Sequence, residues 1–140
     1  MKLGISLLLW TDKVTNKLIP TLIYLKSIGY DSVEVPIFHF DIKKYEQLGT
    51  ILDELQLART AITARGKDTN PISENKKTRE IALEHNKLSI DCCEALGSSL
   101  LAGIYHSAFN VISGAGPTDR EFLAKESLYF MKKNVLYLKG

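Results

Sequence analysis

The stretch GYDSVEVP, Gly29–Pro36, predicts the end of a helix followed at once by a buried strand. Glycine is common just past a helix C-terminus, and Val33 and Val35 give the β-branched run that is typical of a strand. Glu34 lies between the two valines, where a carboxylate must be paired or must face a polar site. Two interpretations follow: a structural carboxylate tied to a Lys, Arg or backbone donor, or a pocket residue that binds hydroxyl groups or assists proton transfer.

The same alternation of strand and helix runs along the whole chain. Four apolar runs predict strands over residues 2–9, 32–38, 57–64 and 98–105, and the longer segments between them have helical periodicity. The connections are too long for hairpins, which favours parallel strands joined by right-handed crossovers. The predicted fold class is therefore α/β, in the order β-α-β-α-β-α-β-α.

Capping and breaking residues set the expected ends of the helices. The first should begin near Asn16 and end at Gly29, with Pro20 in its first turn, where a missing N–H costs least. Asp41 should cap the second, Asn70-Pro71 should open the third, and the fourth should begin at about Thr118. The predicted apolar stripes of the first three helices consist of Leu18, Leu22 and Leu25; of Ile42, Tyr45, Leu48, Leu52 and Leu55; and of Ile81, Leu88, Cys92 and Leu96.

Composition indicates a globular chain. Its 140 residues are 45% hydrophobic and 24% charged, which predicts a single domain over residues 1–140. Eighteen basic residues against sixteen acidic ones, scattered along the chain, argue against a nucleic-acid partner. The apolar run near the start is far shorter than the roughly 20 residues of a membrane span, so we expect no membrane partner and a cytoplasmic protein. The adjacent Cys92 and Cys93 are expected to be small core residues.

Two common α/β nucleotide-binding classes are not favoured. The segment after the first predicted strand, LLLWTDKVT, contains no glycine, whereas a dinucleotide-binding domain carries a glycine-rich phosphate loop there. The chain also has no GxxxxGK[ST] motif of a P-loop nucleotide hydrolase. Two architectures use the predicted unit, an open doubly wound sheet and a closed (β/α)8 barrel, and the missing phosphate loop counts against an open sheet of the Rossmann type.

Polar and aromatic residues recur at the predicted carboxyl ends of the strands, where parallel α/β folds bind ligands. Such a set suits a polyhydroxylated ligand, which needs hydrogen bonds and a stacking surface. Trp10 could stack on a sugar or cap a barrel end, and Arg65 and Lys67 could meet a phosphate or form an exposed basic loop. Half-burial or solvation is expected for His85. The candidate substrate-binding residues are Trp10, Glu34, His39, Tyr105 and His106.

Several segments resemble one enzyme family. MKLGISLLLW, LKSIGYDSVEVP, LARTAITARG and ALGSSLLAGIYHSAF followed by GPTDREF are similar, in order and spacing, to the sugar isomerase and epimerase superfamily of xylose-isomerase-like TIM barrels. The likeness is particularly to D-tagatose and D-psicose 3-epimerases. It implies that the chain is the parallel (β/α)4 amino-terminal half of a TIM barrel, an incomplete barrel, with Trp10, Glu34 and Tyr105 at the substrate end.

The resemblance also implies what this chain lacks. The family holds a divalent metal, commonly Mn, Mg or Co, with Glu, Asp, His and Glu from later strands, and two of those glutamates move the proton. These positions fall at or beyond the last residues, and VLYLKG, where the fifth strand is expected, contains no acid. We therefore expect no catalytic residue, no metal bound by this chain alone, and little activity without a partner.

Open strand edges and apolar surface would also require that partner. It is expected to be a second copy or a separate carboxyl-terminal half. The expected ligand is a sugar or sugar phosphate, and the alternatives are a non-catalytic sugar-binding or assembly module, or an inactive fragment.

Overall fold

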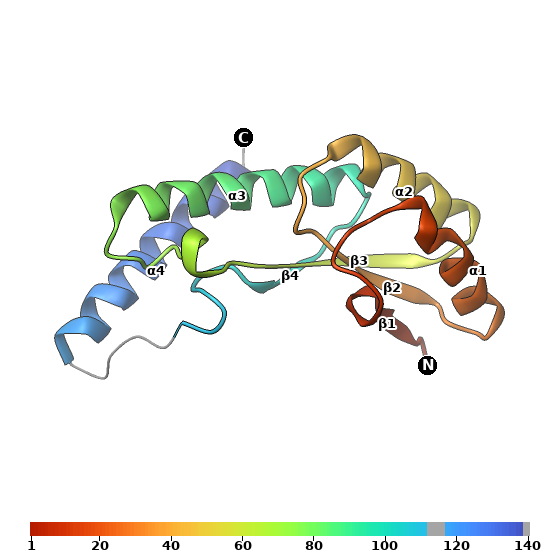
Figure 1. The fold of residues 1–140 in the computed structure, drawn as a ribbon, viewed down its shortest axis with the longest axis horizontal. Helices are drawn as coiled ribbons and strands as arrows, with labels where there is room; N and C mark the ends of the chain where they lie inside the picture. Colours follow the sequence, from red (N-terminus) through yellow and green to blue (C-terminus); the bar gives the residue numbers. More distant parts are fainter. Residues whose placement is uncertain (112–116, 139–140) are drawn as a thin grey trace. The chain divides into compact units, whose positions relative to one another are not determined.

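In the computed structural model, the described residues are 1–111 and 117–138, with side chains from 120 onward in the second range (Figure 1). None of the helices in these ranges is long and apolar enough to cross a membrane. The elements in chain order are β1 (Gly4–Ser6), a 3₁₀ turn (Leu7–Leu9), a second 3₁₀ turn (Asn16–Leu18), α1 (Ile19–Ser27), β2 (Ser32–Pro36), α2 (Ile42–Glu54), β3 (Ala58–Ala64), a third 3₁₀ turn (Lys67–Thr69), α3 (Lys76–Ala95), β4 (Leu101–Ile104) and α4 (Pro117–Leu138).

The chain folds as two compact units. The amino-terminal unit consists of Met1–Thr63 and Ser89–Ala102, and the carboxyl-terminal unit consists of Ala64–Leu88 and Gly103–Gly140. The first contains β1, β2, α1, α2, most of β3 and the last turns of α3. The second contains the first turns of α3, the end of β4 and all of α4.

The strands form one sheet in the order β1-β2-β3-β4. β1 pairs parallel with β2, and β2 pairs parallel with β3. On the other side of β3, the amide of Ala61 donates to the carbonyl of Leu100 at 2.9 Å. Four residues further along both strands, the amide of Arg65 donates to the carbonyl of Ile104 at 2.8 Å, which is a parallel ladder. The predicted parallel α/β fold is confirmed.

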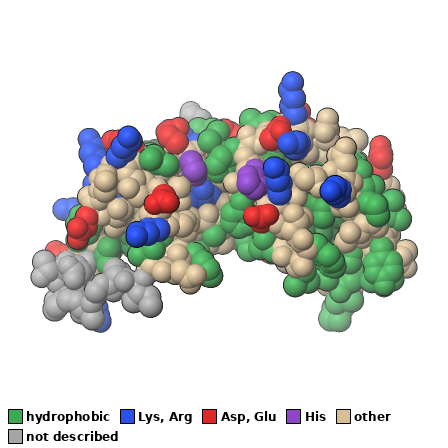
Figure 2. Space-filling model, in the orientation of Figure 1, with side chains coloured by type: hydrophobic (Ala, Val, Ile, Leu, Met, Phe, Trp, Pro, Cys, Tyr) green, Lys and Arg blue, Asp and Glu red, His purple; other side chains and the backbone are tan. Residues whose placement is uncertain are grey.

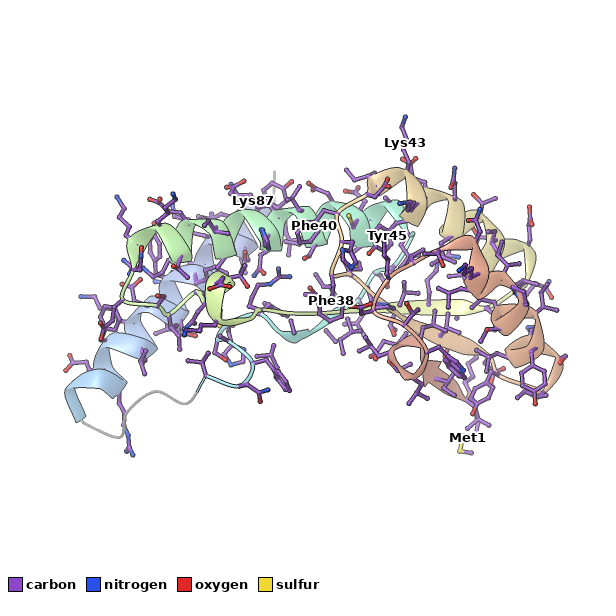
Figure 3. The ribbon with its side chains drawn as sticks, viewed as in Figure 1. Met1, Phe38, Phe40, Lys43, Tyr45 and Lys87 are labelled. Carbon is purple, nitrogen blue, oxygen red and sulfur yellow. The ribbon has the colours of Figure 1, made fainter. Side chains whose placement is uncertain are left out.

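The core of the amino-terminal unit lies between the strands and the helices that cover one face of them, α1 and α2 (Figure 1). Val33 and Val35 of β2 are 1% and 0% exposed and belong to this core. On α2, Tyr45 points inward and donates its hydroxyl to the carbonyl of Pro36 at 3.2 Å, whereas Lys43 points to solvent (Figure 3). The other core residues are Leu7, Val14, Leu22, Leu25, Ile37, Leu48, Leu52, Leu57, Ala61, Cys92, Cys93 and Leu96.

Two glycines lie at positions where a residue with a side chain would not fit the helices well. Gly29 follows α1 with a φ of +98°, which ends the helix as predicted. Gly49 is buried in α2, and a Cβ there would lie 2.8 Å from the carbonyl oxygen of Leu96. The glycine therefore lets α2 approach the end of α3 closely, which offsets its weak helix propensity. Pro20 lies in the first turn of α1 as predicted.

Two element boundaries differ from the prediction because of local hydrogen bonds. The first strand ends at Ser6 rather than residue 9, because the carbonyl of Leu7 accepts the amides of Trp10 and Thr11 in a 3₁₀ turn. The third helix begins at Lys76 rather than at Asn70-Pro71. Asn70 instead starts a turn, and the side chain of Asn75 accepts the amide of Lys77 at 2.9 Å.

The caps of α1 and α2 and the secondary structure of residues 135–138 also differ from the predictions. Asp41 precedes α2, but its carboxylate pairs with Lys44 at 2.9 Å and makes no capping hydrogen bond. The first helix is preceded by a 3₁₀ turn at Asn16, with no side-chain cap. Residues 135–138, expected to form part of a fifth strand, continue α4. The last two residues of VLYLKG lie outside the described residues.

The buried face of α3 differs from the predicted stripe. Ile81 and Leu88 are 38% and 37% exposed, so half of that stripe is wrong. Small and polar residues are buried in their place, which hydrophobic periodicity does not detect. The buried residues of α3 are Ala82, Asn86, Ser89, Cys92 and Cys93. Both cysteines are free and buried, as predicted.

Candidate functional site

Glu34 lies on the sheet face that points away from α1 and α2. Successive residues of a strand point to opposite faces, and Val33 and Val35 point into the helix-covered core. Register places Ser6 and Thr60 on either side of Glu34, so the three side chains form a row across β1, β2 and β3. All three are half-buried. This row could not be predicted from the sequence, because strand register depends on pairing between distant segments.

The Glu34 carboxylate makes no hydrogen bond or ion pair with the residues that the structure describes. The structural interpretation required a Lys, Arg or backbone donor, and none is in contact. Glu34 is the third of five residues in β2 rather than a strand-end residue. Its acceptor oxygens are therefore free on the open face of the sheet, where a ligand hydroxyl could donate to them.

Trp10 and His39 follow the carboxyl ends of β1 and β2, as predicted. Trp10 ends the 3₁₀ turn after β1, its amide donates to Leu7, and half of its side chain is exposed. His39 lies in a bend three residues after β2 and is exposed. The amino-terminal unit thus brings an aromatic ring and an imidazole to the strand ends that adjoin Glu34. Such groups can stack on a sugar and hydrogen-bond to its hydroxyls.

Tyr105 and His106 follow β4 in the carboxyl-terminal unit. The carbonyl of Tyr105 accepts the side-chain amide of Asn86 at 3.4 Å, and its phenol is half-buried. His106 is exposed. The loop continues to Phe109, whose amide donates to the carbonyl of Arg65 at 2.8 Å, so the segment after β4 is fixed to the end of β3.

Arg65 is not part of an exposed basic loop. Its side chain is 3% exposed, and burial lowers its pKa to about 10. Of the two alternatives for these residues, the exposed basic loop is therefore wrong for Arg65, whereas Lys67 is exposed. Half-buried His85 is close enough to feel this cation, since its pKa is lowered first by burial and second by the Arg65 charge.

The donor set does not fit a divalent metal. Among residues 1–111 and 120–138, no three His, Cys, Asp or Glu side chains come together in a way that could hold an ion. The chemistry available to the described site is hydrogen bonding and stacking by its own side chains.

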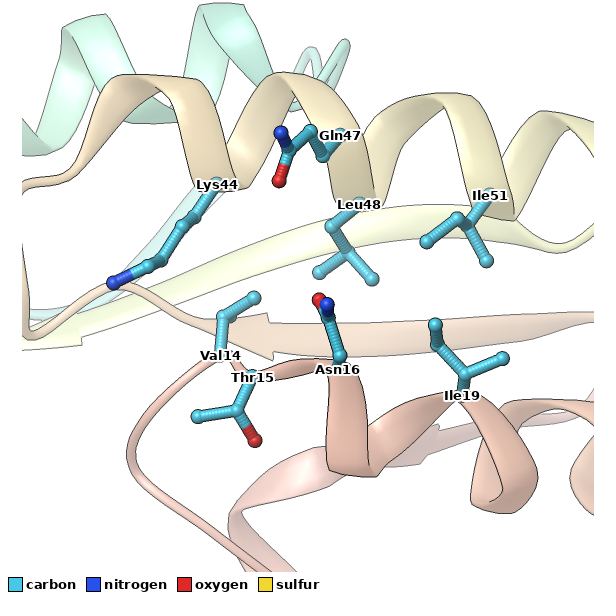
Figure 4. A pocket seen from close by; sticks show the side chains of 8 residues that line it. All are labelled: Val14, Thr15, Asn16, Ile19, Lys44, Gln47, Leu48 and Ile51. Carbon is cyan, nitrogen blue, oxygen red and sulfur yellow. The ribbon is translucent and has the colours of Figure 1, made fainter.

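The sequence did not reveal a groove between the start of α1 and α2 (Figure 4). Its volume is about 330 Å³, and none of the five candidate residues lines it. Val14 and Leu48 form an apolar floor, and Lys44, which lowers the pKa of Asp41 by pairing with it, lies at one end. The lining residues are Val14, Thr15, Asn16, Ile19, Lys44, Gln47, Leu48 and Ile51.

Comparison with known proteins identifies the fold. No protein-family model and no curated protein sequence matches the chain. Solved structures do match, and each is covered over about half its length. A protein of Anabaena variabilis assigned as a sugar phosphate isomerase/epimerase matches 99% of this chain and 50% of its own, at 18% identity and a TM-score of 0.83.

Two epimerases give the same result. The D-allulose 3-epimerase of a Methylomonas species, in complex with D-allulose, matches 98% of this chain and 47% of its own, at 20% identity and a TM-score of 0.79. The D-psicose 3-epimerase of Clostridium cellulolyticum H10, with D-tagatose, matches 98% and 50%, at 15% identity and a TM-score of 0.76. The chain has the fold of half a TIM barrel, and the barrel is not closed.

Proposed function

We propose that this chain is the amino-terminal half of a sugar-binding barrel of the isomerase and epimerase type, close to the ketose 3-epimerases. The observation that carries the proposal is the free Glu34 carboxylate on the open sheet face, in a chain whose fold matches half of several epimerases. A half-buried carboxylate that pairs with none of the described residues keeps its acceptor oxygens available to the hydroxyl groups of a ligand. A cytoplasmic location stays a prediction.

The chain's own residues would bind and orient the sugar. Glu34 would accept hydrogen bonds from hydroxyl groups, and the half-exposed ring of Trp10 would stack on an apolar sugar face. His39 would supply a further hydrogen bond from the loop after β2. Tyr105 and His106 follow β4 in the carboxyl-terminal unit and stay predicted sugar contacts. The divalent metal that the family resemblance implies would act as a Lewis acid when bound, but the described residues do not fit it, so no proton-transfer step is assigned to this chain.

An unphosphorylated sugar is the better candidate ligand. Of the two basic residues that follow β3, Arg65 is buried and only Lys67 is exposed. A phosphate would need several convergent donors, and one mobile ammonium is a weak basis for that. A free ketohexose, such as the D-allulose and D-tagatose in the solved epimerases, requires only hydroxyl and stacking contacts.

A non-catalytic sugar-binding module is the second candidate. It is supported by the donor set, because binding needs Glu34 and its neighbours but no metal group. The two candidates differ in what happens after binding. In the epimerase-half proposal, turnover appears only when a second copy or a separate carboxyl-terminal half completes the barrel; in the second, it never does.

Calorimetric titration of the full chain with D-allulose, D-tagatose and D-fructose tests the proposal, with D-sorbitol as an open-chain control. We expect saturable binding of a ketohexose with a Kd of about 1 mM, equivalent to about 4 kcal/mol, and weaker binding of sorbitol. Incubation with Mn²⁺ followed by chromatography of the sugars measures epimerisation. Absence of saturable binding would overturn the proposal, and epimerisation by a sample that light scattering shows to be monomeric would overturn the assignment of turnover to the completed barrel.

A further inference from the structure

The outer flank of α1 that faces away from α2 is apolar. Leu22 and Leu25 point into the core, and Ile19 lies beside α2 in the groove of Figure 4. At about 100° per residue, Tyr24 and Ile28 fall on the opposite flank. They are 61% and 52% exposed. Figure 2 shows hydrophobic side chains gathered at this end of the amino-terminal unit, where β1 and α1 lie in Figure 1. We call Tyr24 and Ile28 the free flank of α1.

α4 has a similar flank on its side away from α3. The guanidinium of Arg79 pairs with Glu126 at 3.0 Å, and the ammonium of Lys87 lies 5.8 Å from the ring of Tyr137, so these α4 residues face α3. A second set of α4 residues, spaced at i, i+3, i+7 and i+10, forms a stripe about 150° around the helix from them. This free flank of α4 consists of Leu128, Met131, Val135 and Leu138, which are 60%, 47%, 48% and 66% exposed.

α2 and α3, which lie between α1 and α4 in the chain, expose less apolar surface. The exposed surface of α2 is largely charged, and that of α3 is charged apart from Ile81 and Leu88, each only just over a third exposed. α2 and α3 follow interior strands of the sheet, whereas α1 and α4 follow its edge strands, β1 and β4. Apolar flanks on the helices that follow both edge strands indicate that each edge is a contact surface.

We propose that the free flank of α4 binds the free flank of α1 of a second copy of this chain, with β4 of one copy beside β1 of the other. β1 and β4 are the two edge strands of the sheet. The free edge of β4 in one copy can therefore lie next to the free edge of β1 in the other copy, in the same parallel order. One chain corresponds to about half of each solved barrel, so two copies supply a full set of strands. The second copy is the partner that the proposed function requires. The pairing therefore rests on that function, because the paired form would be the one that binds sugar.

The charges beside the two flanks predict how association depends on salt. Lys17 and Lys26 lie on or beside α1, and Lys132 and Lys133 lie on α4, with no acidic residue from 127 to 138. Lys26 donates to the carbonyl of Gln56 at 2.9 Å, and the Lys133 ammonium lies 5.5 Å from the ring of Tyr129. Like charges at the contact repel and are screened by salt, so self-association should strengthen with ionic strength. An acidic partner would give the opposite dependence.

Sedimentation velocity of the full chain tests the pairing. We expect a species of twice the monomer mass of 15.7 kDa, whose fraction rises between 50 and 500 mM NaCl. Tyr24→Glu and Val135→Glu should each lower the association constant at least tenfold. The controls are Ile23→Glu and Leu136→Glu, which are as exposed but lie on other sides of the same helices, and which should keep the dimer. A monomer at all concentrations, or equal loss in the controls, would overturn the inference.

Cross-linking tests which flanks meet. Chains carrying Tyr24→Cys and Val135→Cys should form a mixed disulfide when combined, and neither should cross-link to itself; native Cys92 and Cys93 are buried and should not interfere. Self-linking of Val135→Cys would show α4 against α4 and would overturn the inference. Titration of the same sample with D-allulose separates the two proposals: a monomer that binds sugar overturns only the pairing, and a dimer that does not bind overturns only the function.

Discussion

Replacing Glu34 with glutamine separates a ligand-binding carboxylate from a structural one. The side chain is half-buried on the open sheet face and has no ionic or hydrogen-bonding contact with the described residues. Removing one member of a buried ion pair costs about 3–5 kcal/mol. A nearly isosteric change at a group without such contacts alters stability by about 0.5 kcal/mol or less. We therefore expect the free energy of unfolding of Glu34→Gln to stay within about 0.5 kcal/mol of the parent.

Sugar affinity, unlike stability, should fall in Glu34→Gln. A hydrogen bond to a charged acceptor contributes about 1.5–3 kcal/mol. Glutamine keeps the shape of the side chain but loses the charge and replaces one acceptor oxygen with a donor. Since about 1.4 kcal/mol corresponds to a factor of ten, we expect the affinity for the best-bound ketohexose to fall about 10- to 100-fold.

Urea unfolding followed by circular dichroism measures the first quantity, and calorimetric titration measures the second. Glu46→Gln is the matched control, because Glu46 is an exposed residue on the surface of α2. It should change neither stability nor affinity. A loss of about 3 kcal/mol or more of stability in Glu34→Gln, with sugar affinity unchanged, would refute the reasoning and return Glu34 to a structural role.

Three further predictions concern packing and titration. Gly49→Ala gains about 1 kcal/mol of helix propensity but places a Cβ 2.8 Å from the carbonyl oxygen of Leu96. Because overpacking costs about 1–3 kcal/mol, the urea midpoint of unfolding should fall. A higher midpoint would contradict the close approach of the two helices. Burial raises the pKa of Cys92 to about 11 and also raises the pKa of Cys93, so Ellman's reagent at pH 8 should detect no thiol in the native chain and two after unfolding. Burial lowers the pKa of His85 below its ordinary 6.5, so below about pH 6.5 the unfolded chain binds a proton that the folded chain does not. The free energy of unfolding should therefore fall as the pH drops below about 6.5, and it should fall less steeply in His85→Gln. Equal pH dependence in the two chains would rule out His85 as the cause.

Sequence patterns predicted the element order well, because apolar periodicity directly reflects which side of a strand or helix is buried. They failed where local polar groups compete with the pattern. Leu7 to Leu9 are as apolar as any strand, yet the Ser6 hydroxyl and the Leu7 carbonyl accept nearby amides and close a turn instead. In α3, the small and polar buried residues gave no apolar stripe to read.

The candidate site was predictable only in part. The rule that ligand-binding residues follow parallel strands correctly put Trp10, His39, Tyr105 and His106 in such loops. It did not find the groove beside α2, and it did not reveal that the Arg65 side chain is buried. Burial of a charged residue depends on which distant segments close over it, and a short sequence window contains no information about that.

The polarity of the open sheet face restricts how any partner can complete this fold. The row of Ser6, Glu34 and Thr60 on that face is half-buried and polar, whereas the free flanks of α1 and α4 are apolar. A partner that stacked flat on the open face would bury the Glu34 carboxylate without a counter-charge, which is strongly unfavourable. A partner that adds strands at the edges covers the apolar flanks and leaves Glu34 facing an interior space. In the proposed pairing, completion from the sides would therefore cover the apolar flanks and would leave the polar row facing an enclosed pocket, as sugar binding requires.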